Sequence, residues 1–171
     1  MTAQKITSVE TLAQRSRQWR AEGRRVVLCH GTFDLMHTGH IRYLQRARQE
    51  GDVLLVTVTG DDFVNKGPGR PVFSERLRAE NLAALACVDQ VAINPAVSAV
   101  ELLHQVQPSV YCKGSEYRKA SDDVTGNIQL EQDAVEAHGG AVMFTDELTF
   151  SSSNLLNEHF DVFPPETRAF L

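Results

Sequence analysis

The chain has 171 residues, of which 42% are hydrophobic and 23% are charged, and its formal net charge is −5. This composition is typical of an ordinary soluble globular protein, and no apolar run approaches the roughly 20 residues that a membrane-spanning helix needs. The acidic balance and the lack of a basic stripe argue against a nucleic-acid binder. We therefore expect neither a membrane nor a nucleic acid as a partner.

Three cysteines, Cys29, Cys87 and Cys112, occur without the CxxC spacing of a zinc knuckle, and their odd number argues against a disulfide framework. The first residues, Met1 to Lys5, lack the apolar core of a secretory signal. Both observations favour a reducing cytoplasmic location.

Helical and strand-like segments alternate along the chain. A helix within residues 1–23 is capped by Thr7 or Ser8 and ends at Gly23. In chain order, the segments that follow are predicted as a strand over 26–29, a helix over 38–49, a strand over 53–58, a helix over 74–86, a strand over 89–93, a helix over 96–105, a strand over 109–112, a helix over 127–138, a strand over 141–144 and a helix opening at 151.

This alternation predicts an α/β fold: a Rossmann-like, doubly wound parallel sheet of about five strands with helices on both faces. We expect one domain over residues 1–163 and a tail over 164–171 that begins with two prolines. The loops 31–40, 60–70, 113–117 and 146–153 all follow strands. They should gather at the carboxyl edge of the sheet, where ligands bind in such folds.

The strongest functional signal is the run Gly31-Thr-Phe-Asp-Leu-Met-His37-Thr-Gly-His40, between a buried strand and a helix. His37 and His40 are three residues apart at a helix start and should share one face. Gly39 between them lets a ligand approach the backbone closely. Free N–H groups at a helix N-terminus suit phosphate, and two imidazoles there can donate hydrogen bonds to phosphoryl oxygens.

Weaker signals lie on three other loops. Ser151, Ser152 and Ser153 open the last predicted helix, where serines either cap the helix or bind an anion. Lys66 lies on a Gly/Pro loop and Lys113 at a strand end, and each could equally be a surface lysine. A zinc site on His30, His37 and His40 is another reading, but no nearby cysteine or carboxylate completes it.

The strand followed by G-x-F-D-x-x-H-x-G-H resembles the signature of the HxGH nucleotidylyltransferases, a superfamily that includes glycerol-3-phosphate cytidylyltransferase and phosphopantetheine adenylyltransferase. The resemblance covers about Arg25 to Leu156. The run 67–71, the loop from Lys113 to Tyr117 and the motif 152–154 are most similar to the heptose-1-phosphate adenylyltransferase domain of ADP-heptose synthase. The chain departs from that branch at His30, where asparagine is usual, in Lys113-Gly-Ser-Glu, where Lys-Gly-Gly-Asp is usual, and in a longer segment 118–132.

The resemblance implies transfer of NMP from an NTP, with ATP favoured, to a phosphorylated sugar or similar small acceptor, with pyrophosphate released and no covalent enzyme intermediate. It assigns catalysis to His37, His40 and Lys66, and an orienting role to Asp34. It assigns nucleotide or phosphate binding to Gly31, Thr32, Phe33, Gly39, Arg78 (with Arg76 as an alternative), Lys113, Ser151, Ser152 and Ser153.

The resemblance also implies Mg²⁺ bound with the NTP and not by protein side chains, a homodimer, and a sugar kinase as partner or fused domain. Two alternatives remain open. One is a CTP-dependent cytidylyltransferase acting on glycerol-3-phosphate, another polyol or alcohol phosphate, or a phosphonate. The other is a non-catalytic nucleotide-binding module, which should have lost part of the set His37, His40, Lys66 and the late serines.

Overall fold

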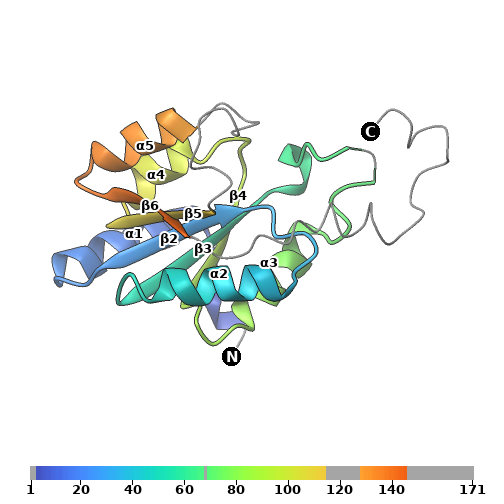
Figure 1. Cartoon of the computed structure of the whole chain (residues 1–171), viewed down its shortest axis with the longest axis horizontal. Helices are drawn as coiled ribbons and strands as arrows, with labels where there is room; N and C mark the ends of the chain where they lie inside the picture. The colour runs from blue at the N-terminus through green and yellow to red at the C-terminus, as the bar shows by residue number, and fades with distance from the viewer. Residues whose placement is uncertain (1–2, 68, 115–127, 146–171) are drawn as a thin grey trace.

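The computed structural model describes residues 3–67, 69–114 and 128–145, and these form one six-stranded sheet with helices on both sides (Figure 1). The strands are β1 (Ile6–Thr7), β2 (Val26–Gly31), β3 (Val53–Thr59), β4 (Gln90–Asn94), β5 (Val110–Gly114) and β6 (Ala141–Thr145). The helices are α1 (Val9–Ala21), α2 (Thr38–Arg48), α3 (Glu75–Ala83), α4 (Val100–Val106) and α5 (Ile128–Glu136), with short 3₁₀ turns at Ala3–Lys5 and Asp61–Phe63.

All strand pairs are parallel, and the strand order is β1-β4-β3-β2-β5-β6. The predicted α/β class with a parallel sheet is therefore confirmed. The sixth strand, β1, was not predicted, because its two residues, paired with Val91 and Ala92, are too few to show a hydrophobic period. The chain leaves β2 towards β3 on one side, while β5 lies on the other, so the crevice of this fold falls between β2 and β5.

Two apolar layers enclose the sheet. Helices α1, α4 and α5 cover one face with residues such as Leu12, Leu103 and Val135, and α2 and α3 cover the other with Leu44 and Leu82 (Figure 1). Every residue of β3 is buried, which explains why this strand reads as a continuous apolar run and not as an alternating one.

Two predicted helix boundaries differ from the structure by three residues or more. Helix α4 begins at Val100 and not at Ala96, because the Asn94 amide donates to the carbonyls of Ala96 and Ser98 and holds this stretch as a turn. Helix α3 ends at Ala83 and not at Ala86, since the chain then makes hydrogen-bonded turns into β4.

The predicted helix at Ser151 and the tail 164–171 lie outside the described residues. Within the described part of the chain, no helix combines the length and the apolar character needed to cross a membrane.

Candidate active site

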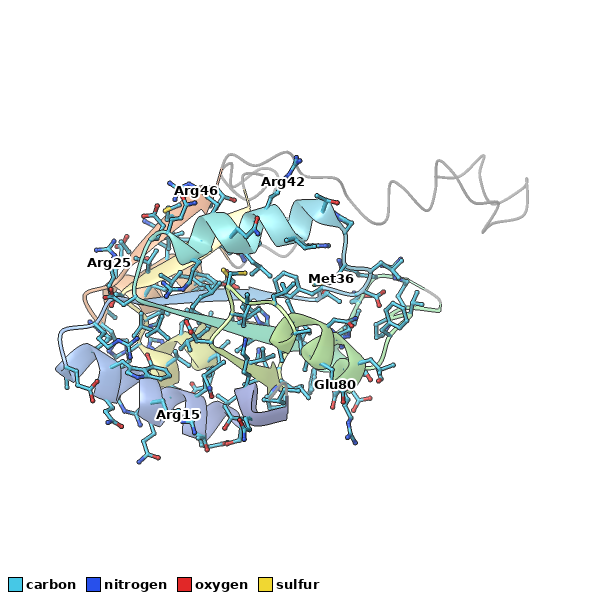
Figure 2. The ribbon with its side chains drawn as sticks, turned by 90° about the horizontal axis from the view of Figure 1, so that it is seen from below. Arg15, Arg25, Met36, Arg42, Arg46 and Glu80 are labelled. Carbon is cyan, nitrogen blue, oxygen red and sulfur yellow. The ribbon has the colours of Figure 1, made fainter. Side chains whose placement is uncertain are left out.

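Two histidine rings stand at the start of α2, after the loop on which Figure 2 labels Met36. His37 is the N-cap residue, and its Nδ1 accepts a hydrogen bond from the Gly39 N–H at 3.0 Å. The Nδ1 atom of His40 accepts from the His37 N–H at 3.4 Å. This reciprocal cap satisfies N–H groups of the first turn, which have no partner within the helix. The cap therefore places both imidazoles side by side, as the spacing predicted.

The cap also assigns the tautomer of the two rings. A neutral imidazole carries its proton on one nitrogen and accepts on the other, and here Nδ1 accepts in both rings. The proton then belongs on Nε2, an assignment that follows from the hydrogen bonds. Burial, followed by the proximity of His37 and Lys66, lowers the pKa of His40 from 6.5 to about 4. Near pH 7, His40 is thus a neutral donor through Nε2.

Aromatic packing fixes the pair of rings. The His37 and His40 centroids are 4.1 Å apart at an interplanar angle of 34°. Phe33 meets His40 edge to face at 5.6 Å and stacks with Tyr43 at 6.5 Å. The Tyr43 hydroxyl donates to the Cys112 carbonyl at 2.6 Å, which ties this packing to β5. The imidazoles are therefore held in place before any ligand binds, as charge-stabilising donors need to be.

The backbone between β2 and α2 has an uncommon conformation. Phe33 has a φ of +48°, in the left-handed region that aromatic residues rarely adopt. A Cβ at Gly31 would lie 3.2 Å from the Phe33 ring, so only glycine leaves the ring its full space. Strain of this kind collects at ligand sites. The N–H donors of Thr32 and Phe33, expected to bind phosphate, lie on this segment.

Asp34 joins this loop to the loop after β3. Asp34 is buried, and its carboxylate accepts from the backbone N–H groups of Val72 and Phe73 at 2.9 to 3.0 Å. It also forms an ion pair with Arg70, with 2.7 Å between Nε and Oδ2. The carboxylate is thus engaged by two backbone donors and by the guanidinium charge, and it orients the second loop.

Lys66 lies on that second loop, with an exposed side chain. Its charge is close enough to His40 to contribute to the lowered pKa of that ring. The structure therefore brings Lys66 towards the histidine pair, from a different strand end, as predicted.

Arg78 does not occupy the position expected of a phosphate ligand. Its side chain is fully buried, and its guanidinium donates to the carbonyls of Phe73, Thr32 and Thr59 at 3.0, 2.6 and 2.7 Å and to Asp61 at 2.7 Å. The expectation of direct phosphate contact is therefore revised, because these bonds occupy the group and leave it no exposed surface. Arg78 instead holds together the loops after β2 and β3.

Arg76, the alternative to Arg78, faces solvent. Its side chain is 85% exposed and pairs with Glu80 four residues later on the same helix, which Figure 2 labels. This is an ordinary exposed ion pair of a helix surface.

Lys113 lies at the end of β5 and is buried. Its Nζ is 2.8 Å from Oε2 of Glu131 and 5.4 Å from the centre of the Tyr111 ring. His30, at the neighbouring end of β2, contacts the hydroxyls of Thr57 and Thr59 at 2.9 and 3.4 Å. Burial, and then the charge of Lys113, lowers the pKa of His30 to about 3. His30 is thus a neutral imidazole between two threonines.

Glu131 is the residue of this region that sequence reasoning missed. It is buried on α5 with Ala134 and Val135, three and four positions later. A carboxylate at a position of the apolar helix face was the signal that could have found it.

The predicted phosphate ligands Ser151, Ser152 and Ser153 lie outside the described residues. Among the residues that are described, no three His, Cys, Asp or Glu side chains group as ligands of a metal ion.

The family described as Cytidylyltransferase-like matches residues 28–158 of the chain. Similar curated proteins include the bifunctional protein HldE of Methylobacillus flagellatus, 37% identical over 159 residues, and that of Rhodopseudomonas palustris, 42% identical over 154 residues. The matches cover 91% and 88% of this chain but 31% and 30% of the relatives, so the chain spans less than a third of their length.

Solved structures share the fold. The lipopolysaccharide core biosynthesis protein from Thermoplasma volcanium superposes with a TM-score of 0.59 at 23% identity, over 75% of this chain and all of that one. Pantothenate synthetase from Thermus thermophilus superposes with a TM-score of 0.59 at 16% identity, over 97% of this chain and 70% of that one. The sheet, the paired histidines at the start of α2 and the family match over residues 28–158 lead to one conclusion: the chain belongs to the cytidylyltransferase-like family.

Proposed function

We propose that this chain transfers a nucleoside monophosphate from an NTP, with ATP favoured, to a phosphorylated sugar or similar small phosphate, and releases pyrophosphate. Membership of the cytidylyltransferase-like family makes nucleotidyl transfer the reaction class. The resemblance of the run 67–71 to the heptose-1-phosphate adenylyltransferase domain, together with identities of 37% to 42% to the HldE proteins, supports a sugar phosphate as acceptor. The single observation that carries the proposal is the pair of imidazoles, 4.1 Å apart, whose Nδ1 atoms are both taken by the helix cap.

The chemistry follows from that cap. The acceptor's phosphate oxygen attacks the α-phosphorus of the NTP in line, a P–O bond forms, and the bond to the pyrophosphate oxygen breaks. Since a phosphate monoester is already an anion near neutral pH, the reaction needs no strong general base. His37 and His40 donate through Nε2 to phosphate oxygens as charge builds up, which is where preorganised donors have the largest effect. The helix N-terminus adds positive potential to the same place.

Other groups complete the set. Lys66, on its exposed loop, neutralises charge in the transition state. The buried Arg78 holds the loops after β2 and β3 together and so keeps Lys66 in position. Lys113 at the β5 end binds the nucleotide, and Ser151, Ser152 and Ser153 bind the far end of the triphosphate. The backbone of Gly31 to Phe33 and Gly39 leaves room for phosphate and offers N–H groups.

The triphosphate would bring Mg²⁺, which neutralises part of its charge. Asp34 is engaged by Arg70 and Asp61 by Arg78, which fits a metal held by phosphate oxygens and water.

A CTP-dependent reaction on a polyol or alcohol phosphate is the second candidate, and the family description favours it. A further activity beside this one is supported by the relatives, which are named bifunctional and are more than three times as long as the matched region. We propose that this partner activity is a sugar kinase.

Pyrophosphate release tests the proposal. The chain is incubated with ATP, CTP, GTP or UTP, each combined with heptose-1-phosphate, other sugar 1-phosphates or glycerol-3-phosphate. We expect release only when an NTP and a phosphorylated acceptor are both present, with ATP and a sugar phosphate giving the highest kcat/KM. CTP with glycerol-3-phosphate as the best pair would establish the second candidate. Nucleotide binding without release for any pair would contradict both.

A further inference from the structure

A buried ion pair lies outside the histidine site. Lys113 and Glu131 are joined at 2.8 Å, and their side chains are only 10% and 6% exposed. The Tyr111 hydroxyl donates to the same carboxylate oxygen at 3.2 Å. Three polar side chains thus meet around one oxygen between β5 and α5.

The pair lies next to the crevice of the sheet. Cys29 and Cys112 are register partners of β2 and β5, so His30 and Lys113, one residue further, are the second-last residues of adjacent strands. Their side chains lie on the face covered by α1, α4 and α5, since Cys29 and Cys112 pack on the opposite face. The crevice between these two strands is where ligands bind in a doubly wound sheet. Lys113 therefore lies at the substrate edge, on the other face of the sheet from α2.

Stability does not account for this pair. Replacing a buried ion pair by apolar residues of similar volume is often neutral or stabilising, because the desolvation of two charges offsets their attraction. Glu131 shares its helix face with the core residues Ala134 and Val135, where an apolar side chain would pack equally well. A carboxylate at this position is better explained by what it does to Lys113.

We propose that Glu131 is a positioning residue that holds the Lys113 ammonium at the β5 end for binding of the nucleoside triphosphate. The inference rests on the proposed function and extends it to a residue with no part in that function as stated. A lysine side chain has a long flexible stem and a point charge, so a site that relies on it needs a second group to fix it. The carboxylate of Glu131, itself fixed by the Tyr111 hydroxyl, supplies that support.

Four variants test the proposal: Glu131→Gln, Lys113→Met, the double variant of both, and Glu136→Gln as a control. Glu136 is exposed on the same helix, and its carboxylate accepts from the Gln132 amide, so the control makes the same chemical change away from the crevice. Glutamine at position 131 keeps an acceptor for the Tyr111 hydroxyl. Thermal unfolding is measured together with KM for the NTP, KM for the acceptor, and kcat.

Each single variant should raise KM for the NTP by roughly 10- to 100-fold, as expected for loss of one charge-assisted hydrogen bond. Each should also lower the unfolding temperature, because one buried charge loses its counter-ion. The double variant should regain much of the unfolding temperature but keep the raised KM of Lys113→Met alone. The effects of the two substitutions on KM for the NTP should then not multiply, because Glu131 acts through Lys113.

Three results would overturn the proposal: a normal KM for the NTP in Glu131→Gln, a KM that recovers with stability in the double variant, or an effect on the acceptor's KM alone. Titration calorimetry with ATP and CTP measures Kd for the same variants, so the comparison can also be made without turnover. If the unmodified chain released no pyrophosphate, the proposed function would fail, while the Kd values would still decide the role of Glu131.

Discussion

Asp34 and Arg70 form an ion pair with 2.7 Å between Oδ2 and Nε, and it joins the loop after β2 to the loop after β3. The two side chains are 2% and 12% exposed, so the pair is largely shielded from water and salt. One of these loops leads into His37 and His40 at the start of α2, and the other carries Lys66. The relative position of the proposed catalytic groups therefore depends on this contact.

The first prediction concerns Asp34→Asn. The asparagine amide has one acceptor oxygen and no charge, whereas the carboxylate accepts from the Val72 and Phe73 N–H groups and forms an ion pair with Arg70. We therefore expect a loss of about 1–3 kcal/mol in the free energy of unfolding. Because the Lys66 loop loses its anchor, Lys66 is no longer held in its catalytic position. The kcat/KM should therefore fall by at least roughly tenfold. Urea unfolding and pyrophosphate release measure the two effects. Asp62→Asn, at an exposed position of the same sheet edge, is the control. A variant of Asp34 with full kcat/KM would show that the loops do not need this anchor.

The second prediction separates two roles of Arg78. An ammonium cannot reach the carbonyls of Phe73, Thr32 and Thr59 together, so Arg78→Lys should cost on the order of 2–4 kcal/mol in unfolding free energy. Arg76→Lys, two residues away on the solvent side, should change it by less than about 0.5 kcal/mol. Chemical denaturation of both variants makes the comparison. If Arg78→Lys left stability intact and raised only KM for the NTP, direct phosphate contact would be the correct role after all.

The third prediction concerns Lys66→Ala. Since the side chain is exposed, the free energy of unfolding should stay within about 0.5 kcal/mol of the unmodified chain, while kcat falls. Removing the nearby positive charge should also raise the pKa of His40 above its present value of about 4. NMR titration of the His40 ring measures this shift. An unchanged or lower pKa would mean that Lys66 does not lie near the ring in solution.

The fourth prediction concerns pH and His30. Its folded pKa of about 3 lies below the 6.5 of an unfolded chain, so the unfolded state binds the proton more tightly. The stability contributed by the neutral ring is complete above about pH 6.5 and is lost as the pH falls towards 3. His30→Asn removes this dependence. Between pH 7 and pH 5 the unmodified chain should lose up to about 2 kcal/mol more than the variant. If urea unfolding showed that the unmodified chain and His30→Asn lose the same free energy of unfolding between pH 7 and pH 5, the burial of a neutral His30 would be contradicted.

Much of the fold could be predicted because its signals are local. The continuous apolar run of β3 shows a strand buried on both faces, and Ser8 and Ser74 cap α1 and α3 through their hydroxyls. The strand β1 could not be predicted, since two residues acquire strand geometry only through pairing with β4. The start of α4 was misplaced because the Asn94 side chain, and not helix propensity, decides the backbone there.

The site could be predicted in part for the same reason. His37 and His40 are close in sequence, so their shared helix start follows from spacing. The burial of Arg78 and its bonds to two distant loops depend on tertiary packing that no local pattern encodes. The partnership of Lys113 with Glu131 joins a strand end to a helix 18 residues later, and only the packed structure brings them together.

The most direct test of the account is pyrophosphate release by His40→Ala, with an NTP and acceptor that the unmodified chain uses. His104→Ala, which removes an exposed histidine on α4, serves as the control. We predict that kcat of His40→Ala falls by about 10²–10³-fold, as expected for loss of one preorganised donor, while the control keeps full turnover. Near-normal turnover by a folded His40→Ala protein would contradict the claim that the paired imidazoles carry the chemistry.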